Sequence, residues 1–201
     1  MALGKEDWIR EALFAIAEGG SAAVAVEPLA KRLGATKGSF YWHFADRRAL
    51  IAEALAYWER EYTDAAIAAV EPIADPHKRI ATLLAAVMED DREGQADVGL
   101  LASAYDPLVA PVFRRVQHKR FAFLERCFRD AGFPPAAARH RARIAYGGFL
   151  AWFEQRRVDP DAPPPARELR AYQRALLKLL VDAEPVACPA EDVRGLGSSP
   201  G

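Results

Sequence analysis

The segment from Gly34 to Phe44 constrains the fold of this chain more than any other segment. It follows a short amphipathic stretch, residues 27–33, which Gly34 ends, and Thr36 is a residue type that caps the start of a helix. Two helices joined by about three residues form a helix-turn-helix, whose second helix can lie in the major groove of DNA. At about 100° per residue, Phe40 and Phe44 share one face of this second helix, and that face must be buried.

The opposite side of the second helix carries Gly38 and Trp42, flanked by Tyr41 and Ala45. A glycine in the first turn lets the backbone approach another molecule closely. Lys37, at the N-terminal end, could donate to guanine O6 and N7, and the aromatic rings offer apolar contact with a thymine methyl group or a donor to phosphate. These outward-facing residues favour contact with a partner over exposure to solvent.

Residues 34–50 resemble the DNA-binding signature of the tetracycline-repressor (TetR) family of transcriptional regulators. The resemblance rests on the helix-turn-helix, the run Phe-Tyr-Trp-His-Phe and the basic start of the next helix, and with the preceding helices it covers about the first quarter of the chain. The family usually has Ser or Thr just before the helix at 27–33, where this chain has Ala25, so we expect no phosphate contact there. The resemblance, with Trp42 added from its outward position, implies DNA contacts at Thr36, Lys37, Gly38, Ser39, Tyr41, Trp42, His43 and Arg47.

Two of these residues have a second interpretation. Periodicity places His43 nearer to the buried side of its helix, so it either contacts a phosphate on the flank of the groove or packs against the protein. Arg47 and Arg48 lie near the start of the next helix, where positive charge is unfavourable to the helix dipole. A neighbouring phosphate would explain them, and so would ordinary surface exposure.

The charge of the chain is local rather than general. Over 201 residues the formal net charge is −1, whereas residues 25–48 hold five cations and two acids. A local basic patch on a near-neutral protein suits adjustable binding to DNA better than permanent coating of it. The large, non-basic remainder argues against an architectural DNA protein.

Helical periodicity runs through the chain as far as about residue 182, and no segment shows the alternation of a strand. We therefore predict an all-α fold: a helix-turn-helix DNA-binding domain at residues 1–48, a helical regulatory and dimerisation domain at 49–183, and a disordered tail at 184–201. The acidic residues 89–93 are expected at a helix end and in a loop. The predicted helices span residues 5–18, 27–33, 36–44, 46–69, 77–90, 96–105, 106–131, 136–157 and 167–182.

One helix-turn-helix contacts too few bases to select a site in a genome, whereas a two-fold dimer reads two half-sites of a palindromic operator about 34–36 Å apart. The resemblance implies pairing through the last two long helices as a four-helix bundle. Small residues and leucines on these helices suit close helix approach, although they could instead pack inside one subunit. The predicted dimer residues are Gly147, Gly148, Ala151, Leu169, Tyr172, Leu176, Leu179 and Leu180.

The resemblance also implies that small apolar ligands bind between the helices of the second domain and change the separation of the two recognition helices. Aromatic residues with a few polar tips suit such a pocket, although each could be ordinary core. The predicted pocket residues are Tyr62, Met88, Tyr105, Phe113, Gln117, Phe149 and Trp152. Four scattered histidines and two cysteines, Cys127 and Cys188, have no metal-ligand spacing, so we expect no metal and no cofactor.

These observations predict a homodimeric, DNA-binding transcriptional repressor that a small, largely apolar effector releases from its operator. The alternatives are a ligand-independent regulator, an activator, or an all-helical enzyme that uses the same cavity. No hydrolase, phosphate-loop or nucleotide-binding motif is present, so we expect no enzyme. The N-terminus is not a signal peptide and no apolar run approaches about 18 residues, so a cytoplasmic protein without a membrane span is expected.

Overall fold

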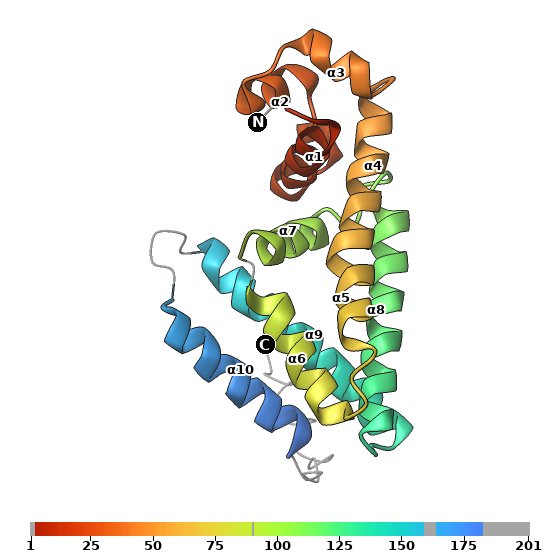
Figure 1. Ribbon diagram of the computed structural model, residues 1–201, viewed down its shortest axis with the longest axis vertical. Helices are drawn as coiled ribbons and strands as arrows, with labels where there is room; N and C mark the ends of the chain where they lie inside the picture. The colour runs from red at the N-terminus through yellow and green to blue at the C-terminus, as the bar shows by residue number, and fades with distance from the viewer. Residues whose placement is uncertain (1–2, 90, 159–163, 183–201) are drawn as a thin grey trace, which may run out of the picture.

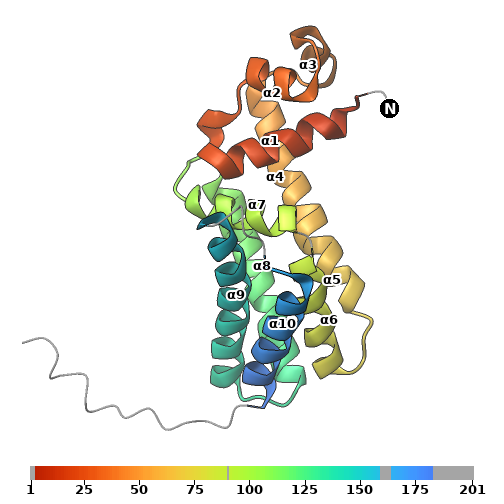
Figure 2. The ribbon, with the colours of Figure 1, turned by 90° about the vertical axis from the view of Figure 1, so that its left-hand side faces the viewer.

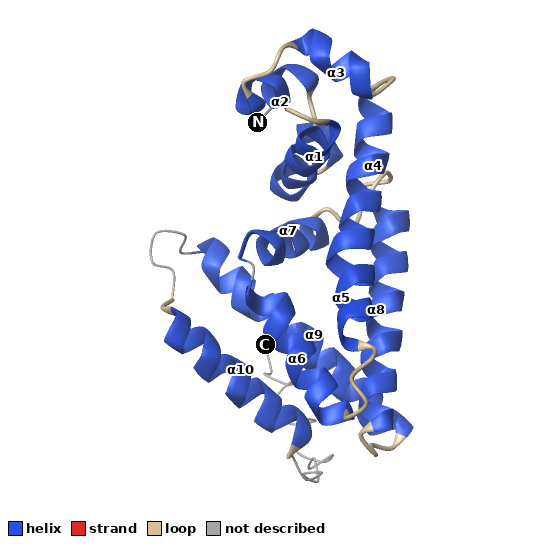
Figure 3. Ribbon diagram, in the orientation of Figure 1, coloured by secondary structure: helices blue, strands red, loops and turns tan. Residues whose placement is uncertain are grey.

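The computed structural model describes residues 3–89, 91–158 and 164–182, and all regular structure in these ranges is helical (Figure 3). The predicted all-α fold is confirmed. The elements are α1 (Lys5–Gly19), η1 (Ser21–Ala23), α2 (Val26–Leu33), α3 (Lys37–His43), α4 (Arg47–Glu59), η2 (Arg60–Asp64), α5 (Ala65–Val70), α6 (Pro76–Glu89), α7 (Asp91–Ala102), α8 (Ala110–Asp130), α9 (Pro135–Val158) and α10 (Ala166–Val181). The predicted tail at 184–201 lies outside the described residues.

Local sequence signals set the ends of the first helices. Gly20 follows α1 with φ 69°, and Gly34 ends α2 in the left-handed conformation, with φ 63° and ψ 27°. Both conformations favour glycine because it has no Cβ. Thr36 caps α3, since its hydroxyl accepts a hydrogen bond from the backbone N–H of Ser39. The helix-turn-helix therefore forms where the sequence predicts it.

The molecule is elongated, with α1, α2 and α3 at one end (Figure 1). From there α4 continues through the π-helical turn η2 into α5, and α8 runs beside this long helix. The sequence predicts one helix over 46–69 but not its π-helical turn. On the other side of the body α9 and α10 pack against each other (Figure 2).

Helix α7 lies across the molecule between α1 and α9, and two glycines allow this close packing. A Cβ atom added at Gly99 would lie 2.3 Å from the carbonyl oxygen of Ala17 in α1. A Cβ atom added at Gly94 would lie 2.2 Å from the ring of Phe153 in α9. Both distances are far below van der Waals contact. Helix α7 therefore packs closely against α1 and α9 because these two positions are glycines.

One hydrophobic core crosses the predicted domain boundary at residues 48 and 49. Trp8 and Ile16 of α1 share this core with Trp58 of α4, Leu100 of α7 and Val116 of α8, and all five side chains are fully buried. A change in the packing of the body can therefore reach the helix-turn-helix through buried contacts.

The predicted starts of two helices are wrong. Helix α7 begins at Asp91 rather than Ala96, so residues 91–93 lie in a helix and not in a loop. Helix α8 begins at Ala110 rather than Asp106. Residues 103–109 form turns instead, because the Asp106 carboxylate accepts from the backbone N–H groups of Leu108 and Ser21.

Within the described ranges, no helix combines the length and the apolar character needed to cross a membrane.

Candidate nucleic-acid interface and internal cavity

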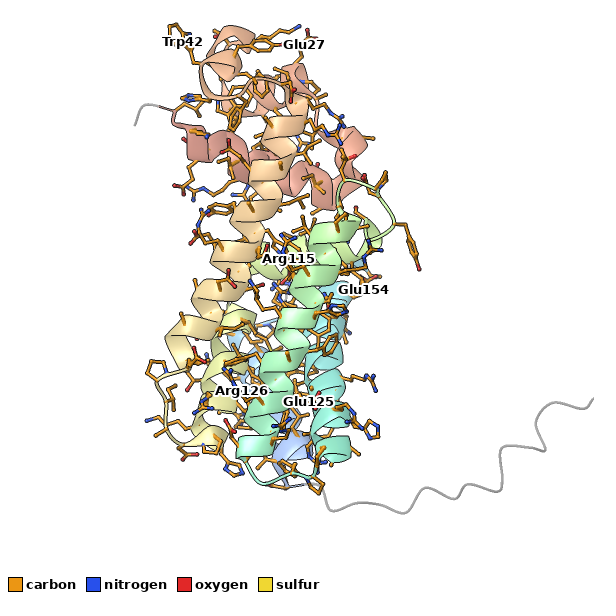
Figure 4. All side chains as sticks on the ribbon, turned by 90° about the vertical axis from the view of Figure 1, so that its right-hand side faces the viewer. Glu27, Trp42, Arg115, Glu125, Arg126 and Glu154 are labelled. Atoms are coloured by element: carbon orange, nitrogen blue, oxygen red, sulfur yellow. The ribbon has the colours of Figure 1, made fainter. Side chains whose placement is uncertain are left out.

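The outward side of α3 lies at the end of the molecule farthest from the helical body (Figure 4). Trp42 is 88% exposed and Tyr41 is 57% exposed, and Lys37 and Gly38 are exposed beside them. Phe40, in contrast, is fully buried against Trp8 of α1, with 5.5 Å between the ring centroids. A soluble surface rarely exposes an indole ring to this degree without a partner.

The N-terminal turn of α3 is fixed by two hydrogen bonds between the same residues. Thr36 Oγ1 accepts from the Ser39 backbone N–H at 3.2 Å, and Ser39 Oγ donates to the Thr36 carbonyl oxygen at 2.8 Å. Lys37 Nζ lies 2.6 Å from Glu27 Oε1 in the first turn of α2, and this hydrogen bond raises the pKa of Lys37 and lowers the pKa of Glu27. The sequence alone does not predict this role of Glu27.

Arg47 has an internal partner that the sequence did not predict. Its guanidinium donates through Nε to the carbonyl oxygen of Val24 and through Nη2 to the carbonyl oxygen of Ser21. It therefore anchors the segment that leads into α2, and a phosphate contact would have to use its remaining N–H groups. Asp46 caps the same helix by accepting from the Ala49 backbone N–H at 2.8 Å, as its position suggests.

His43 is half-buried at the last turn of α3, with its ring edge toward Phe44 at 6.2 Å between centroids. A half-buried ring is compatible with both alternatives, packing against the protein and contact with a phosphate.

A cavity of ≈ 180 Å³, open to solvent on one side, lies between the helices of the body. Its walls come from η2, α5, α6, α7, α8 and α9. Two of the seven predicted pocket residues, Tyr62 and Phe149, line it. Most of the wall is aliphatic or aromatic, as in sites for small apolar ligands.

The other five predicted pocket residues lie elsewhere. Tyr105 is 97% exposed on the turn between α7 and α8, because the helix predicted to hold it ends earlier. Phe113 stacks on Trp58 in the core near α1, with 5.9 Å between centroids. Met88 and Trp152 pack in a separate small core with Phe153, beside the cavity but not in its wall. Gln117 is not in the wall, but its Nε2 donates to the hydroxyl of Tyr146, which is.

The polar end of the cavity is a buried network of an ion pair and hydrogen bonds that the sequence does not predict. Arg120 Nη1 lies 3.0 Å from Asp97 Oδ1, and the same oxygen accepts from Trp58 Nε1 at 2.6 Å. Tyr146 adds its hydroxyl, which accepts from Gln117 Nε2, and burial raises the pKa of this phenol. The sequence did contain a signal, since Arg120 interrupts the apolar stripe of α8 and Asp97 stands among apolar residues.

The same network holds the π-helical turn of the long helix. Arg120 Nε donates to Thr63 Oγ1 at 2.8 Å, and its Nη2 donates to the carbonyl oxygen of Tyr62 at 3.2 Å. A π-helical turn leaves backbone carbonyl groups without their usual α-helical partners, so an arginine beside it satisfies one of them. The side chain of Arg120 therefore connects the polar end of the cavity to the long helix that follows α3.

One turn closer to α3, a second cluster joins the long helix to α8. The Glu59 carboxylate forms salt bridges with Arg115 Nη2 at 2.5 Å and with Lys119 Nζ at 2.8 Å. Lys119 Nζ also lies 2.6 Å from Asp64 Oδ1. The hydrogen bond from Arg115 outweighs the effect of burial and, with Lys119, lowers the pKa of Glu59 to about 2. This carboxylate is therefore ionised across the physiological range.

Several predicted dimer residues pack inside the chain instead. Leu176 and Leu180 are buried in the core between α9 and α10, so they are not available to a second subunit. A Cβ atom at Gly148 would lie 2.8 Å from Leu176 Cδ1, and the carbonyl oxygen of Gly148 accepts from the Tyr172 hydroxyl at 2.7 Å. Leu169 is half-buried against the small core that contains Trp152.

The exposed side of α9 and α10 nevertheless keeps a row of small and apolar residues. The leucines of α10 do not predict this row, because most of them lie on the face that α10 buries within the chain. Predicted residues on the exposed row are Gly147, Ala151 and Leu179, and Ile144 and Val158 extend it. Nothing lies within 4 Å of a Cβ atom added at Gly147.

Comparison with known proteins agrees with this geometry. Residues 9–54 match the family described as "Bacterial regulatory proteins, tetR family". No curated protein matches the sequence. Among solved structures, a transcriptional regulator from Rhodococcus sp. Rha1 is similar with a TM-score of 0.71 and 20% identity, over 91% of this chain and 100% of that chain.

Two further structures with this fold hold ligands. FadR from Bacillus subtilis, in complex with stearoyl-CoA, has a TM-score of 0.63 and 15% identity, over 89% of this chain and 98% of that one. AibR, in complex with isovaleryl coenzyme A and operator DNA, has a TM-score of 0.67 and 17% identity, over 88% and 97%. The N-terminal domain of this chain therefore matches the tetR family of bacterial regulatory proteins, and the whole chain has the fold of these solved regulators.

Proposed function

We propose that this protein is a homodimeric transcriptional repressor of the cytoplasm that binds a palindromic operator and leaves it when a small, largely apolar effector fills the internal cavity. The observation that carries the proposal is the outward side of α3, where Trp42 and Tyr41 are exposed at the end of the molecule. The predicted DNA contacts are on or next to this helix. We do not propose an enzyme, because the polar residues of the cavity form hydrogen bonds and ion pairs with one another and with the turn η2 of the long helix.

The two-fold partner would dock on the exposed row of α9 and α10, which holds Gly147, Ala151 and Leu179. Small residues let two helices approach closely, and two helices from each subunit would form a four-helix bundle. In such a dimer the two copies of α3 can bind the two half-sites of an operator, which a single α3 cannot do.

An effector would act through the turn η2. Tyr62 and Thr63 belong to this turn and line the cavity, and the long helix that contains them begins at Arg47, with three residues between it and the end of α3. A ligand that binds one packing of η2 better than the other shifts the separation of the two copies of α3. A change from 1:99 to 99:1 requires about 5.5 kcal/mol of differential binding, which two sites in a dimer can share. The complexes of AibR and FadR with acyl-coenzyme A support ligand control in this fold.

The test compares two double variants in DNA binding. Lys37→Ala with Tyr41→Ala removes side chains from α3, and Lys78→Ala with Tyr105→Ala removes the same residue types from exposed sites elsewhere. The first variant should lose site-specific binding while it keeps its helicity and its dimerisation. The second should bind like the unchanged protein. Equal specific affinity of the two variants would contradict the proposed function.

A further inference from the structure

The cavity has one polar end, and its two buried charges neutralise each other. Asp97 is 5% exposed and the Arg120 side chain is 12% exposed, with 3.0 Å between them. Glu61, the other charged residue in the wall, is at the surface and pairs with Arg60 at 2.6 Å. A ligand that entered with a charged head group would therefore have no uncompensated partner there, and desolvation would oppose its binding.

The arginine has little capacity left for a ligand anion. Its Nε is taken by Thr63 Oγ1, one Nη2 hydrogen by the Tyr62 carbonyl oxygen, and its Nη1 faces Asp97. An anion would have to displace Asp97, which would leave a buried carboxylate without its cation. Asp97 is also held by Trp58 Nε1 at 2.6 Å, so this displacement costs a second hydrogen bond.

Two hydrogen-bonding positions at the same end remain open among the described residues. Asp97 Oδ2 receives no hydrogen bond from them, because both recorded contacts go to Oδ1. The hydroxyl of Tyr146 accepts from Gln117 Nε2 and interacts with the Arg120 guanidinium, which can only donate, so its own hydrogen is left for a ligand among the described residues. One acceptor beside one donor matches a group that both donates and accepts, such as a hydroxyl or an amide.

Most of the remaining wall is apolar and favours apolar ligand surface. It includes Ile67, Leu83, Val87, Phe123 and Phe149. We propose, on the basis that this cavity is the effector site, that its ligand is an uncharged and largely apolar molecule with a single hydroxyl or amide group, and that carboxylate and ammonium head groups are rejected. The head group binds Asp97 and Tyr146, and the apolar part lies against η2, α6 and α8.

Three probes with the same alkyl chain test the ligand class: octan-1-ol, octanoate and octylammonium. Calorimetry on the full chain at neutral pH should give an affinity for octan-1-ol that is at least about tenfold higher than for either ion. Tighter binding of octanoate or octylammonium, or binding by none of the three, would overturn the proposed class. A weakening of octanoate binding as the pH rises through the pKa of octanoic acid, with constant octan-1-ol binding, supports it without any variant.

Variants of the buried pair should reverse the order of the probes. Asp97→Asn keeps an acceptor for Trp58 and leaves Arg120 without its anion, so octanoate should gain at least about tenfold over octan-1-ol. Arg120→Gln should favour octylammonium in the same way. The double variant, which is neutral again, should restore the preference for octan-1-ol. An unchanged order in all folded variants contradicts the proposal.

A further pair of variants locates the probe. Ala66→Phe places a ring in the cavity wall and should abolish octan-1-ol binding, whereas Ala69→Phe, on the exposed side of the same helix, should not. Equal binding by both variants would place the probe outside the cavity and contradict the inference. Octan-1-ol that binds in the cavity but leaves the operator complex unchanged would contradict the proposed function while the ligand class stands.

Discussion

The Asp106 carboxylate accepts a hydrogen bond from the backbone N–H of Ser21 at 2.8 Å, across 85 residues of sequence. Asp106 lies in the turn between α7 and α8, and Ser21 begins the turn between α1 and α2. Ser21 in turn offers its carbonyl oxygen to Arg47 at the start of α4. These contacts connect the body, the helix-turn-helix and the long helix at one point.

Replacement of Asp106 by Asn should weaken this connection. The amide keeps one acceptor oxygen for two N–H donors, those of Ser21 and Leu108, so one donor loses its partner. We expect a loss of about 1–3 kcal/mol in the free energy of unfolding, measured by urea denaturation. Hydrogen exchange should accelerate first in residues 20–24. Glu125→Gln on α8 serves as the control, and an equal stability of the two variants would contradict the role of Asp106.

Replacement of Glu27 by Gln should strengthen DNA binding. Glu27 holds Lys37 at 2.6 Å and adds a negative charge beside the surface proposed to face phosphates. Without it, Lys37 is free to contact a phosphate, and the slope of log K against log salt concentration should steepen by about 0.9 for each added contact. Fluorescence anisotropy over a salt series measures this slope. Glu125→Gln makes the same change in charge at the other end of the molecule (Figure 4) and should leave the slope unchanged.

Two glycine-to-alanine variants should separate folding from DNA binding. At Gly99 a Cβ atom would lie 2.3 Å from a backbone oxygen of α1, so the variant should lose about 1–3 kcal/mol of stability. At Gly38 the nearest atom is Thr36 Oγ1 at 3.8 Å, so alanine should fold as well as glycine. Gly38→Ala should nevertheless weaken operator binding, because it adds a methyl group where the backbone approaches DNA. Thermal unfolding and anisotropy together distinguish the two effects, and a reversed pattern would contradict both assignments.

Acid should weaken the contact between α4 and α8. The pKa of Glu59 is lowered from 4.5 to about 2 in the folded protein, chiefly by the hydrogen bond from Arg115. A lowered folded-state pKa means that the contribution is complete above the unfolded-state value and is lost as the pH falls toward 2. Between about pH 6 and about pH 3 the unchanged protein should therefore lose more stability than Glu59→Gln. Parallel stability curves for the two proteins would show that this ion cluster does not contribute.

The sequence predicts the helix-turn-helix end well because its signals are local. Gly34 ends α2, Thr36 caps α3, and the i, i+4 spacing of Phe40 and Phe44 marks the buried side, so Trp42 must face outward. Each of these relations spans a few residues, and the structure confirms the cap and the burial. The ion pair between Lys37 and Glu27 is different, because it depends on the angle between two helices.

The cavity depends on contacts that no local pattern contains. Arg120 and Asp97 lie on different helices, and only the crossing of α7 over the body brings them within 3.0 Å. An apolar stripe shows that one side of a helix is buried but not what covers it. For this reason the sequence predicts Phe113 in the cavity and Leu176 on the dimer surface, whereas Phe113 stacks on Trp58 and Leu176 packs against Gly148.

The most direct test of the account is selection of bound duplexes from a random pool by the full chain. The outward side of α3, doubled by a two-fold partner, predicts enrichment of one inverted repeat whose half-site centres are about 34–36 Å apart or a multiple of this distance. The Trp42→Ala variant should fail to enrich it. A pool that stays random, or a single unrepeated motif that the Trp42→Ala variant enriches equally, would contradict the account.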